Sequence, residues 1–321
     1  MEKYRILTFD GGGVRGLITV ILMQRLAREP GLKDWYKRAD LYAGTSTGGL
    51  IALGMSHGIP LNTMRKLYEE KCARVFDDSW IDDVLDLFNV TGADYSNEFL
   101  ESELKKWFGN TTIGGLEKRV LVTTFDLDNA DDASVKYSGT PQARKWKPKL
   151  FHNFVGTDTD ARAPAYKVGL YTSAAPTYFP TVDGFVDGGV FANNPSMCAL
   201  VQTQDPRNAD PRDHPPLDQI ALLSMGTGEL LKYISGDNLD WGYAQWVKPL
   251  LSILMDGVAG ISDYQCRQLL RDKYHRLQPQ FPPGQEFKLD SVKPEEIQAM
   301  VEFAEGWDIS ETAAWLEQQW L

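Results

Sequence analysis

Two consecutive strand–turn–helix units at the start of the chain constrain its fold more than any other feature. In the first unit, the apolar residues 5–9 predict a buried strand, and residues 15–29 predict a helix too apolar to be exposed. In the second unit, residues 41–43 and 47–56 repeat this order around another glycine-containing turn. Two such units in succession predict a parallel sheet with helices on its faces.

The remaining chain continues this pattern and becomes mainly helical towards its end. The apolar runs predict further strands at 119–125, 134–137, 149–154, 184–186 and 219–224, and helices at 60–72, 241–257, 260–271 and 293–304. No internal repeat or clear linker interrupts the sequence, and the turn-rich stretch 205–216 is the best boundary if there are two domains. We expect one α/β domain over residues 1–321, with a helical C-terminal region at 229–321.

The composition excludes several classes of function. The chain has 33 basic and 44 acidic residues, which gives a formal charge of −11. We therefore expect no basic surface that could bind a nucleic-acid polymer. The same charge opposes docking on anionic membranes, so any peripheral membrane contact would be chiefly apolar. The three cysteines are widely spaced, which fits a reducing compartment and argues against a disulfide framework or a zinc site.

The distribution of apolar residues also bears on localisation. The first predicted strand begins at residue 5, which leaves no room for a signal peptide before it. No apolar run reaches the roughly 18 residues that a transmembrane helix requires. We therefore expect a soluble, cytoplasmic protein that can contact membranes only at their periphery.

The second glycine-containing turn places a serine between two glycines. Gly44, Ser46 and Gly48 form a G-x-S-x-G motif between an apolar strand and an apolar helix, the context of a nucleophile elbow. The start of the following helix would direct N–H groups and a positive dipole end towards the Ser46 hydroxyl. A turn rich in Gly, Ser and Thr but without chemistry is the alternative interpretation.

The first turn carries more glycine than a simple reversal needs. Gly11, Gly13 and Gly16 match G-x-G-x-x-G, but the second strand ends at a serine rather than at the acidic residue of a dinucleotide site. A glycine loop at a helix start can instead present N–H groups to the oxyanion of a tetrahedral intermediate. We expect Gly11, Gly12 and Gly13 to form this oxyanion hole, with Arg15 adding positive potential or bracing the loop.

The expected base for Ser46 is a carboxylate rather than a histidine. His57 would lie at the far end of the helix that follows Ser46, and none of the other three histidines has the context of a catalytic residue. Asp187 ends an apolar strand and precedes Gly188 and Gly189, which allow another backbone to approach closely. A buried carboxylate can accept the serine proton directly if its pKa is raised. An Asp-Gly-Gly turn without chemistry is the alternative.

Four motifs together resemble the patatin-like phospholipases. They are Asp10-Gly-Gly-Gly-x-Arg-Gly16, Gly44-Thr-Ser-Thr-Gly48, Ser173-Ala-Ala-Pro-Thr-Tyr-Phe179 and Asp187-Gly-Gly-x-x-x-Asn-Asn-Pro195, in this order and within residues 4–228. The resemblance implies a three-layer α/β/α fold with a mainly parallel sheet. It also implies a Ser46–Asp187 dyad, an oxyanion hole from the Gly11–Gly13 backbone with Arg15, and a supporting role for the other motif positions: Asp10, Gly16, Gly44, Gly48, Gly188 and Gly189.

The resemblance further implies metal-independent hydrolysis of acyl esters in lipids, of the phospholipase A or lysophospholipase type, without a cofactor. Some small bacterial members are gated by nucleotides, so a small-nucleotide activator is a conceivable partner and the C-terminal region a conceivable regulatory part. The alternative function is a non-catalytic lipid-binding or nucleotide-binding signalling module.

Two acidic segments suggest additional roles. Residues 126–132 resemble a calcium loop, but Asp131 occupies the position where an EF-hand requires glycine, and the distal glutamate is missing. A solvated hairpin loop is the better interpretation. Residues 80–88 alternate apolar and acidic faces at helical spacing, which would suit a lid or a membrane-facing edge as well as ordinary core packing.

Overall fold

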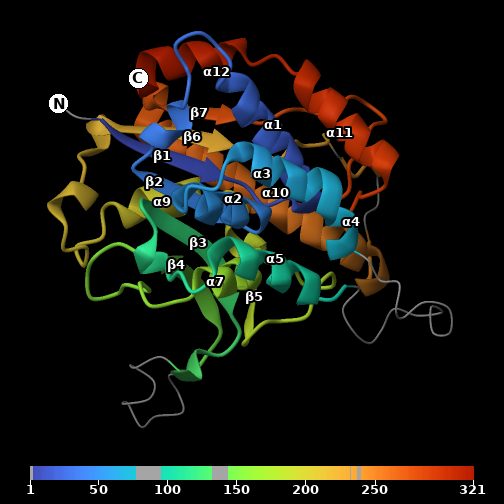
Figure 1. Cartoon of the computed structure of the whole chain (residues 1–321). Helices are drawn as coiled ribbons and strands as arrows, with labels where there is room; N and C mark the ends of the chain where they lie inside the picture. The colour runs from blue at the N-terminus through green and yellow to red at the C-terminus, as the bar shows by residue number, and fades with distance from the viewer. Residues whose placement is uncertain (1–2, 77–94, 132–143, 232, 237–239) are drawn as a thin grey trace.

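The computed structural model describes residues 3–76, 95–131, 144–231, 233–236 and 240–321. Within them, strands form one seven-stranded sheet (Figure 1). The strands are β1 (Tyr4–Phe9), β2 (Leu41–Thr45), β3 (Arg119–Asp126), β4 (Lys147–His152), β5 (Phe185–Asp187), β6 (Ile220–Met225) and β7 (Tyr274–Leu277). Their order is β4-β3-β2-β1-β6-β7, and β5 pairs with β3. The pairs among β1, β2, β3, β6 and β7 are parallel, whereas β4 and β5 run antiparallel to β3.

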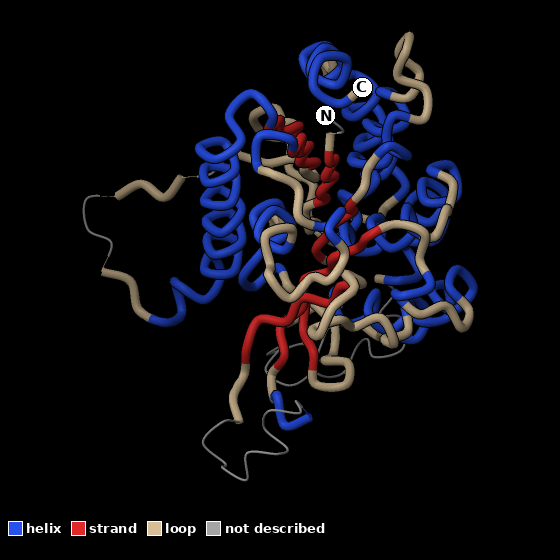
Figure 2. The backbone as a smooth tube through the Cα atoms, turned by 90° about the vertical axis from the view of Figure 1, so that its left-hand side faces the viewer, coloured by secondary structure: helices blue, strands red, loops and turns tan. Residues whose placement is uncertain are grey.

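Helices flank this sheet on both faces (Figure 2). They are α1 (Gly16–Leu26), α2 (Thr47–Ser56), α3 (Leu61–Lys66), α4 (Cys72–Val75), α5 (Glu98–Phe108), α7 (Ala165–Ser173), α8 (Gly189–Ala192), α9 (Ser196–Gln202), α10 (Tyr243–Leu270), α11 (Pro294–Gly306) and α12 (Ser310–Trp315). A π-helical turn, Leu67–Lys71, joins α3 to α4. In the described part of the chain, every helix is too short or too polar to span a bilayer.

Alternation along β1 shows why the fold has three layers. Leu7 and Phe9 belong to the larger apolar core, which includes residues of α1, α2 and α11. Tyr4 and Ile6 point the other way and belong to a smaller core with residues of α9 and α10. Because successive strand side chains point to opposite faces, a central strand that is apolar on both faces requires helices on both. The expected three-layer α/β/α fold with a mainly parallel sheet is confirmed.

The C-terminal region differs from its prediction in two places. The two helices expected at 241–257 and 260–271 are one helix, α10, because Gly257 and Gly260 lower helix stability by only about 1 kcal/mol each and do not break it. Strand β7 was not predicted, since its four residues are half polar. It forms because β6 offers it a parallel edge, and its terminal residues Tyr274 and Leu277 are buried.

Other predicted elements agree less uniformly. Helices α5 and α7 were not predicted, and the helix expected at 60–72 is divided by the π-helical turn. The strand expected at 134–137 and the amphipathic segment at 80–88 lie outside the described residues.

Strand β3 positions two neighbours end to end along one edge. β2 ends at Thr45, which lies opposite Thr123 of β3. The antiparallel β5 ends at Asp187, which lies opposite the next residue of β3, Thr124. β4 pairs along residues 121–126 and therefore occupies the other edge of β3. The end of β2 and the end of β5 consequently meet beside the middle of β3.

Candidate active site

Ser46 occupies a strained turn between β2 and α2. Its φ and ψ angles are 55° and −127°, a region that non-glycine residues rarely adopt and that is often found at active sites. The turn is closely packed: a Cβ atom on Gly44 would lie 2.0 Å from the Gly48 carbonyl oxygen, and one on Gly48 would lie 2.2 Å from the Phe9 carbonyl oxygen. Glycine at both positions is therefore a steric requirement of the elbow.

Thr172 fixes the backbone of this turn. The Ser46 N–H donates to Thr172 Oγ1 at 2.8 Å, and the same hydroxyl donates to the Thr123 carbonyl oxygen at 2.7 Å. Thr172 is fully buried near the end of α7. It precedes the Ser173–Phe179 motif, but the sequence alone did not single it out.

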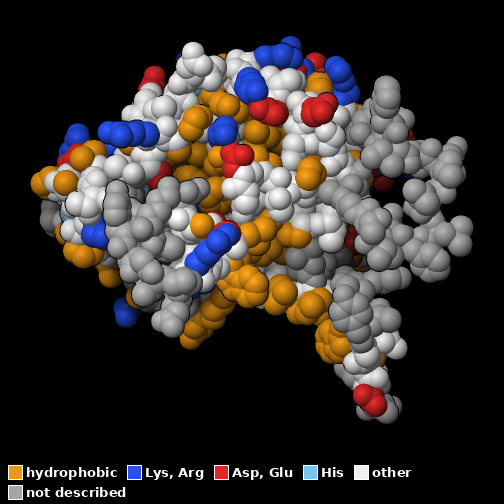
Figure 3. Space-filling view, turned by 90° about the horizontal axis from the view of Figure 1, so that it is seen from below, with side chains coloured by type: hydrophobic (Ala, Val, Ile, Leu, Met, Phe, Trp, Pro, Cys, Tyr) orange, Lys and Arg blue, Asp and Glu red, His pale blue; other side chains and the backbone are white. Residues whose placement is uncertain are grey.

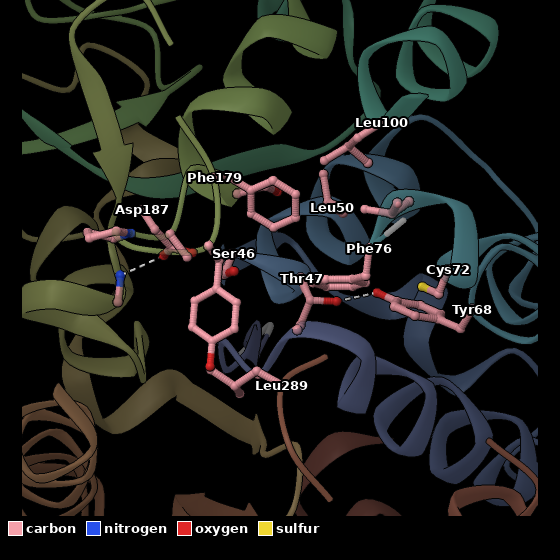
Figure 4. Close-up of a pocket in the computed structure, with 18 of the residues that line it drawn as sticks. Ser46, Thr47, Leu50, Tyr68, Cys72, Phe76, Leu100, Phe179, Asp187 and Leu289 are labelled. Atoms are coloured by element: carbon pink, nitrogen blue, oxygen red, sulfur yellow. Dashed lines mark hydrogen bonds between the residues drawn. The ribbon is translucent and has the colours of Figure 1, made fainter. Parts of the chain in front are cut away.

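Asp187 faces Ser46 from the end of β5 (Figure 4). The Gly189 N–H donates to Oδ1 at 2.7 Å, and the nearby Ser46 hydroxyl also favours the charged form of the carboxylate. The side chain is only 5% exposed. Burial raises the pKa of Asp187 to about 7, because desolvation of the charged carboxylate outweighs the favourable effects of Ser46 and Gly189.

The glycine loop after β1 lies beside Ser46. A Cβ atom on Gly11 would lie 3.3 Å from Ser46 Cβ. The Gly11 N–H donates to the Asn193 carbonyl oxygen at 3.1 Å, so it is already engaged. Within the described residues, the N–H groups of Gly12 and Gly13 donate to no other protein group, and both residues line the cavity that contains Ser46. The geometry thus favours Gly12 and Gly13 over Gly11 as oxyanion donors.

Arg15 braces this loop from the side away from that cavity. Its backbone N–H and its Nε both donate to the Gly12 carbonyl oxygen, at 3.2 and 3.4 Å. In a trans peptide the N–H points opposite to the C=O, so these bonds direct the Gly13 N–H away from Arg15. Gly13 has a φ of 57°, and a Cβ atom there would lie 2.2 Å from the Leu289 carbonyl oxygen. Of the two roles expected for Arg15, bracing is the one that its contacts support.

The other motif positions hold the site together. Asp10 is buried and pairs with Arg276 of β7 at 2.7 Å. Gly16 and Gly188 allow neighbouring elements to approach closely. A Cβ atom on Gly16 would lie 2.3 Å from Thr47 Oγ1, and one on Gly188 would lie 2.2 Å from Thr123 Oγ1. These contacts join the first strand–helix unit to the second and to β7, and the segment after β5 to β3.

An apolar cavity of about 90 Å³ is lined by Ser46 and Asp187 and extends away from them (Figure 4). Its walls come from α2, the π-helical turn, α4, α5 and the segment after α7; they include Leu50, Tyr68, Cys72, Phe76, Leu100 and Phe179. The Tyr68 hydroxyl hydrogen-bonds with Thr47 Oγ1, next to the nucleophile. A hydrophobic chain of a substrate fits such a lining better than a polar one.

The four histidines contact other parts of the protein. His57 packs on Phe108, His152 packs on Phe154, His214 Nε2 bonds to the Asn208 carbonyl oxygen, and His275 Nε2 bonds to Thr312 Oγ1. None lines the cavity of Ser46.

In the acidic loop, Asp128 pairs with Arg144. Among the described residues, no group of three or more His, Cys, Asp or Glu side chains is arranged to hold a metal ion.

Comparisons with known proteins find relatives of this chain. The family model described as patatin-like phospholipase matches residues 7–200. A cGAMP-activated phospholipase of Pseudomonas aeruginosa is 30% identical over 289 residues, which cover 89% of this chain and 81% of the relative. The putative sporulation hydrolase CotR of Bacillus subtilis is 28% identical over 355 residues, which cover 100% of this chain and 99% of that protein. The structure of VipD from Legionella pneumophila aligns with 99% of this chain and 67% of its own, at 12% identity and a TM-score of 0.48.

Proposed function

Since this chain belongs to the patatin-like phospholipase family, we propose that it hydrolyses fatty-acyl esters of lipids with Ser46 as the nucleophile and Asp187 as the general base. The observation that carries this proposal is the position of a buried carboxylate, Asp187, facing Ser46 in the lining of one apolar cavity. Phospholipase A and lysophospholipase activities are the reaction types that this arrangement suits.

The reaction has two halves. In the first, Ser46 Oγ attacks the ester carbonyl carbon while its proton moves to Asp187, and the Gly12 and Gly13 N–H groups stabilise the oxyanion. Collapse of the tetrahedral intermediate breaks the ester bond, and the leaving alcohol takes the proton from Asp187. In the second half, Asp187 removes a proton from water, which attacks the acyl carbonyl carbon. The bond from this carbon to Ser46 Oγ then breaks, Asp187 returns the proton to Ser46 Oγ, and the fatty acid is released.

The environment of Asp187 supports its role as base. A pKa of about 7 keeps the carboxylate available near neutral pH and makes it a better proton acceptor than an exposed aspartate. The hydrogen bond from the Ser46 N–H to Thr172 fixes the backbone from which the hydroxyl projects, which helps to position the nucleophile.

The proposal is tested with Ser46→Ala and Asp187→Asn, with the exposed Asp218→Asn as a matched control. We expect both dyad variants to lose hydrolysis of phosphatidylcholine and of p-nitrophenyl butyrate, and we expect a fluorophosphonate to label the wild type but not Ser46→Ala. Retention of most activity by either dyad variant would refute the dyad. Absence of labelling in the wild type would favour a non-catalytic lipid-binding or nucleotide-binding module.

We also propose that α10 contacts the membrane surface during catalysis. This helix exposes the large apolar side chains of Trp246, Leu250, Ile253, Leu254 and Ile261. It lies at the back of the molecule in Figure 1 and therefore along the lower edge of Figure 3, where hydrophobic side chains gather. An apolar contact of this kind is compatible with a net charge of −11 and with a cytoplasmic protein that binds membranes peripherally.

A nucleotide activator is a separate proposal that depends on one relative. The Pseudomonas aeruginosa phospholipase is described as cGAMP-activated, and the chain matches it over residues of both the catalytic and the C-terminal parts. Addition of a cyclic dinucleotide to the hydrolysis assay tests this directly, with an increase in rate as the supporting result.

A further inference from the structure

The carbonyl groups of the glycine loop after β1 are bound by side chains from elsewhere in the protein. The Gly12 carbonyl oxygen accepts the hydrogen bonds from Arg15 described above. The Gly11 carbonyl oxygen accepts a hydrogen bond from the Thr227 hydroxyl at 3.0 Å. Thr227 follows β6, 216 positions further along the chain, and its side chain is only 2% exposed. A buried contact therefore joins the loop to a distant part of the chain.

This hydrogen bond sets the orientation of one peptide group. The Gly11 carbonyl and the Gly12 N–H belong to the same peptide, and in a trans peptide they point in opposite directions. Because Thr227 holds the carbonyl, the Gly12 N–H points away from Thr227. Thr227 lines a neighbouring polar cavity of about 470 Å³, whereas Gly12 lines the apolar cavity together with Ser46. The Gly12 N–H is therefore directed towards the cavity of Ser46.

Thr227 also packs against the backbone of the loop. A Cβ atom on Gly12 would lie 2.2 Å from Thr227 Oγ1 and 2.6 Å from Thr227 Cβ. Both distances are far shorter than van der Waals contact, so only glycine leaves room for the threonine at this position. Thr227 and the loop therefore fit each other in shape as well as through the hydrogen bond.

The residues on both sides of Thr227 are themselves held in place. The Gly226 carbonyl oxygen accepts a hydrogen bond from the hydroxyl of Thr19 in α1 at 2.9 Å. The Gly228 N–H donates to Oε1 of Gln278, which follows β7, at 3.1 Å. Because its two neighbours are bound in this way, Thr227 presents its hydroxyl to the loop from a fixed position.

We propose that Thr227 is a positioning residue for the oxyanion hole, which holds the Gly12 N–H in the direction of the oxyanion before the substrate binds. This inference rests on the proposed hydrolysis at Ser46 and adds a residue to it. Thr227 acts through the Gly11–Gly12 peptide, as Arg15 acts through the next one. A donor that is oriented in advance stabilises the oxyanion without reorganisation during the reaction.

The test compares Thr227→Val, which lacks the hydroxyl, with Thr227→Ser, which retains it. Thr227→Val is expected to lower kcat for p-nitrophenyl butyrate about tenfold or more and to leave KM within about twofold, because an oxyanion donor acts on the transition state and not on the bound ester. Thr227→Ser is expected to keep most of the kcat of the wild type.

Thr203→Val is the matched control. Thr203 follows α9, is fully buried, and donates its hydroxyl to the Leu200 carbonyl oxygen at 2.7 Å, away from the glycine loop. This substitution removes the same kind of hydrogen bond and is expected to leave kcat unchanged.

A transition-state analogue separates positioning from a general loss of structure. Ser46 Oγ can add to the carbonyl carbon of an alkyl trifluoromethyl ketone, with its proton passing to Asp187, which places an oxyanion in the hole. The corresponding trifluoromethyl alcohol cannot react in this way. We expect the Ki of the ketone to rise in Thr227→Val by the factor by which kcat/KM falls, and the Ki of the alcohol to stay unchanged. If circular dichroism shows that Thr227→Val does not fold, Thr227→Ala takes its place with the same expectations.

Three results would overturn the role of Thr227 while the wild type hydrolyses esters. They are equal kcat in Thr227→Val and Thr203→Val, a loss of kcat that Thr227→Ser shares, and parallel rises in the Ki values of the ketone and the alcohol. A wild type that neither hydrolyses esters nor reacts with a fluorophosphonate would instead contradict the proposed hydrolysis itself, and this assignment with it.

Discussion

Replacement of Asp187 by Asn is expected to stabilise the fold at alkaline pH although it abolishes catalysis. The carboxylate is 5% exposed, and its pKa rises from 3.8 to about 7 on folding because burial disfavours its charged form. Between these two pH values the folded state binds more protons at this site than the unfolded state does. Stability contributed by the protonated group is therefore lost as pH rises from about 4 to about 7.

The magnitude follows from the size of this shift. Each pH unit inside the window costs about 1.4 kcal/mol, so the full shift corresponds to about 4 kcal/mol. Between pH 5 and pH 8 only the two units from 5 to 7 count, which gives about 3 kcal/mol. Asn cannot ionise and resembles the protonated acid, so it avoids this loss. Its side-chain oxygen can still accept the Gly189 N–H.

Urea unfolding of the wild type and of Asp187→Asn at both pH values measures this effect. The free energy of unfolding of the variant, relative to that of the wild type, is expected to increase by about 3 kcal/mol when the pH is raised from 5 to 8. Contributions from other titrating groups cancel in this double difference. A relative change below about 1 kcal/mol, or one of opposite sign, would refute the account of Asp187 as a carboxyl held in an unfavourable environment for function.

Three further predictions concern the same site. The kcat/KM for p-nitrophenyl butyrate is expected to rise with pH to a plateau with a midpoint near pH 7, because Asp187 must be ionised to act as base; a flat profile from pH 6 to 8 contradicts this. Thr172→Val removes the acceptor of the Ser46 N–H and is expected to lower the free energy of unfolding in urea by about 1–3 kcal/mol and to lower kcat. Thr172→Ser keeps the hydroxyl and is expected to keep the stability and the kcat of the wild type. Equal kcat in the two variants contradicts a positioning role. Leu100→Trp fills part of the apolar cavity and is expected to shift the preference among p-nitrophenyl esters towards shorter acyl chains, with no shift arguing against this cavity as the acyl site.

The parts of the site that depend on local patterns could be predicted from the sequence. Gly44, Ser46 and Gly48 are adjacent in the chain, and the steric need for glycine at such a turn is a local property. Asp187 was identified because it ends an apolar strand and because no histidine had a suitable context. The parallel sheet with helices on its faces followed from the two strand–turn–helix units, and the three-layer fold from the resemblance of the four motifs.

The parts that depend on tertiary contacts could not be predicted. Thr172 acts through a hydrogen bond to a residue 126 positions away, and nothing in its neighbours indicates that partner. The engagement of the Gly11 N–H by Asn193 likewise depends on how two distant loops pack. Strand β7 is too short and polar to be identified without β6 beside it, yet it supplies Arg276 to Asp10.

The end-to-end arrangement of β2 and β5 along β3 has a consequence for how this enzyme can evolve. The proposed nucleophile and base are spaced by the hydrogen-bond register of one strand, whereas the proposed acyl cavity is walled mainly by helices and loops outside the sheet. Substitutions in Leu50, Phe76 or Leu100 can therefore change which lipids are accepted without altering the distance between Ser46 and Asp187. Selection can therefore change the lipid preference of the protein while the arrangement of Ser46 and Asp187 stays constant.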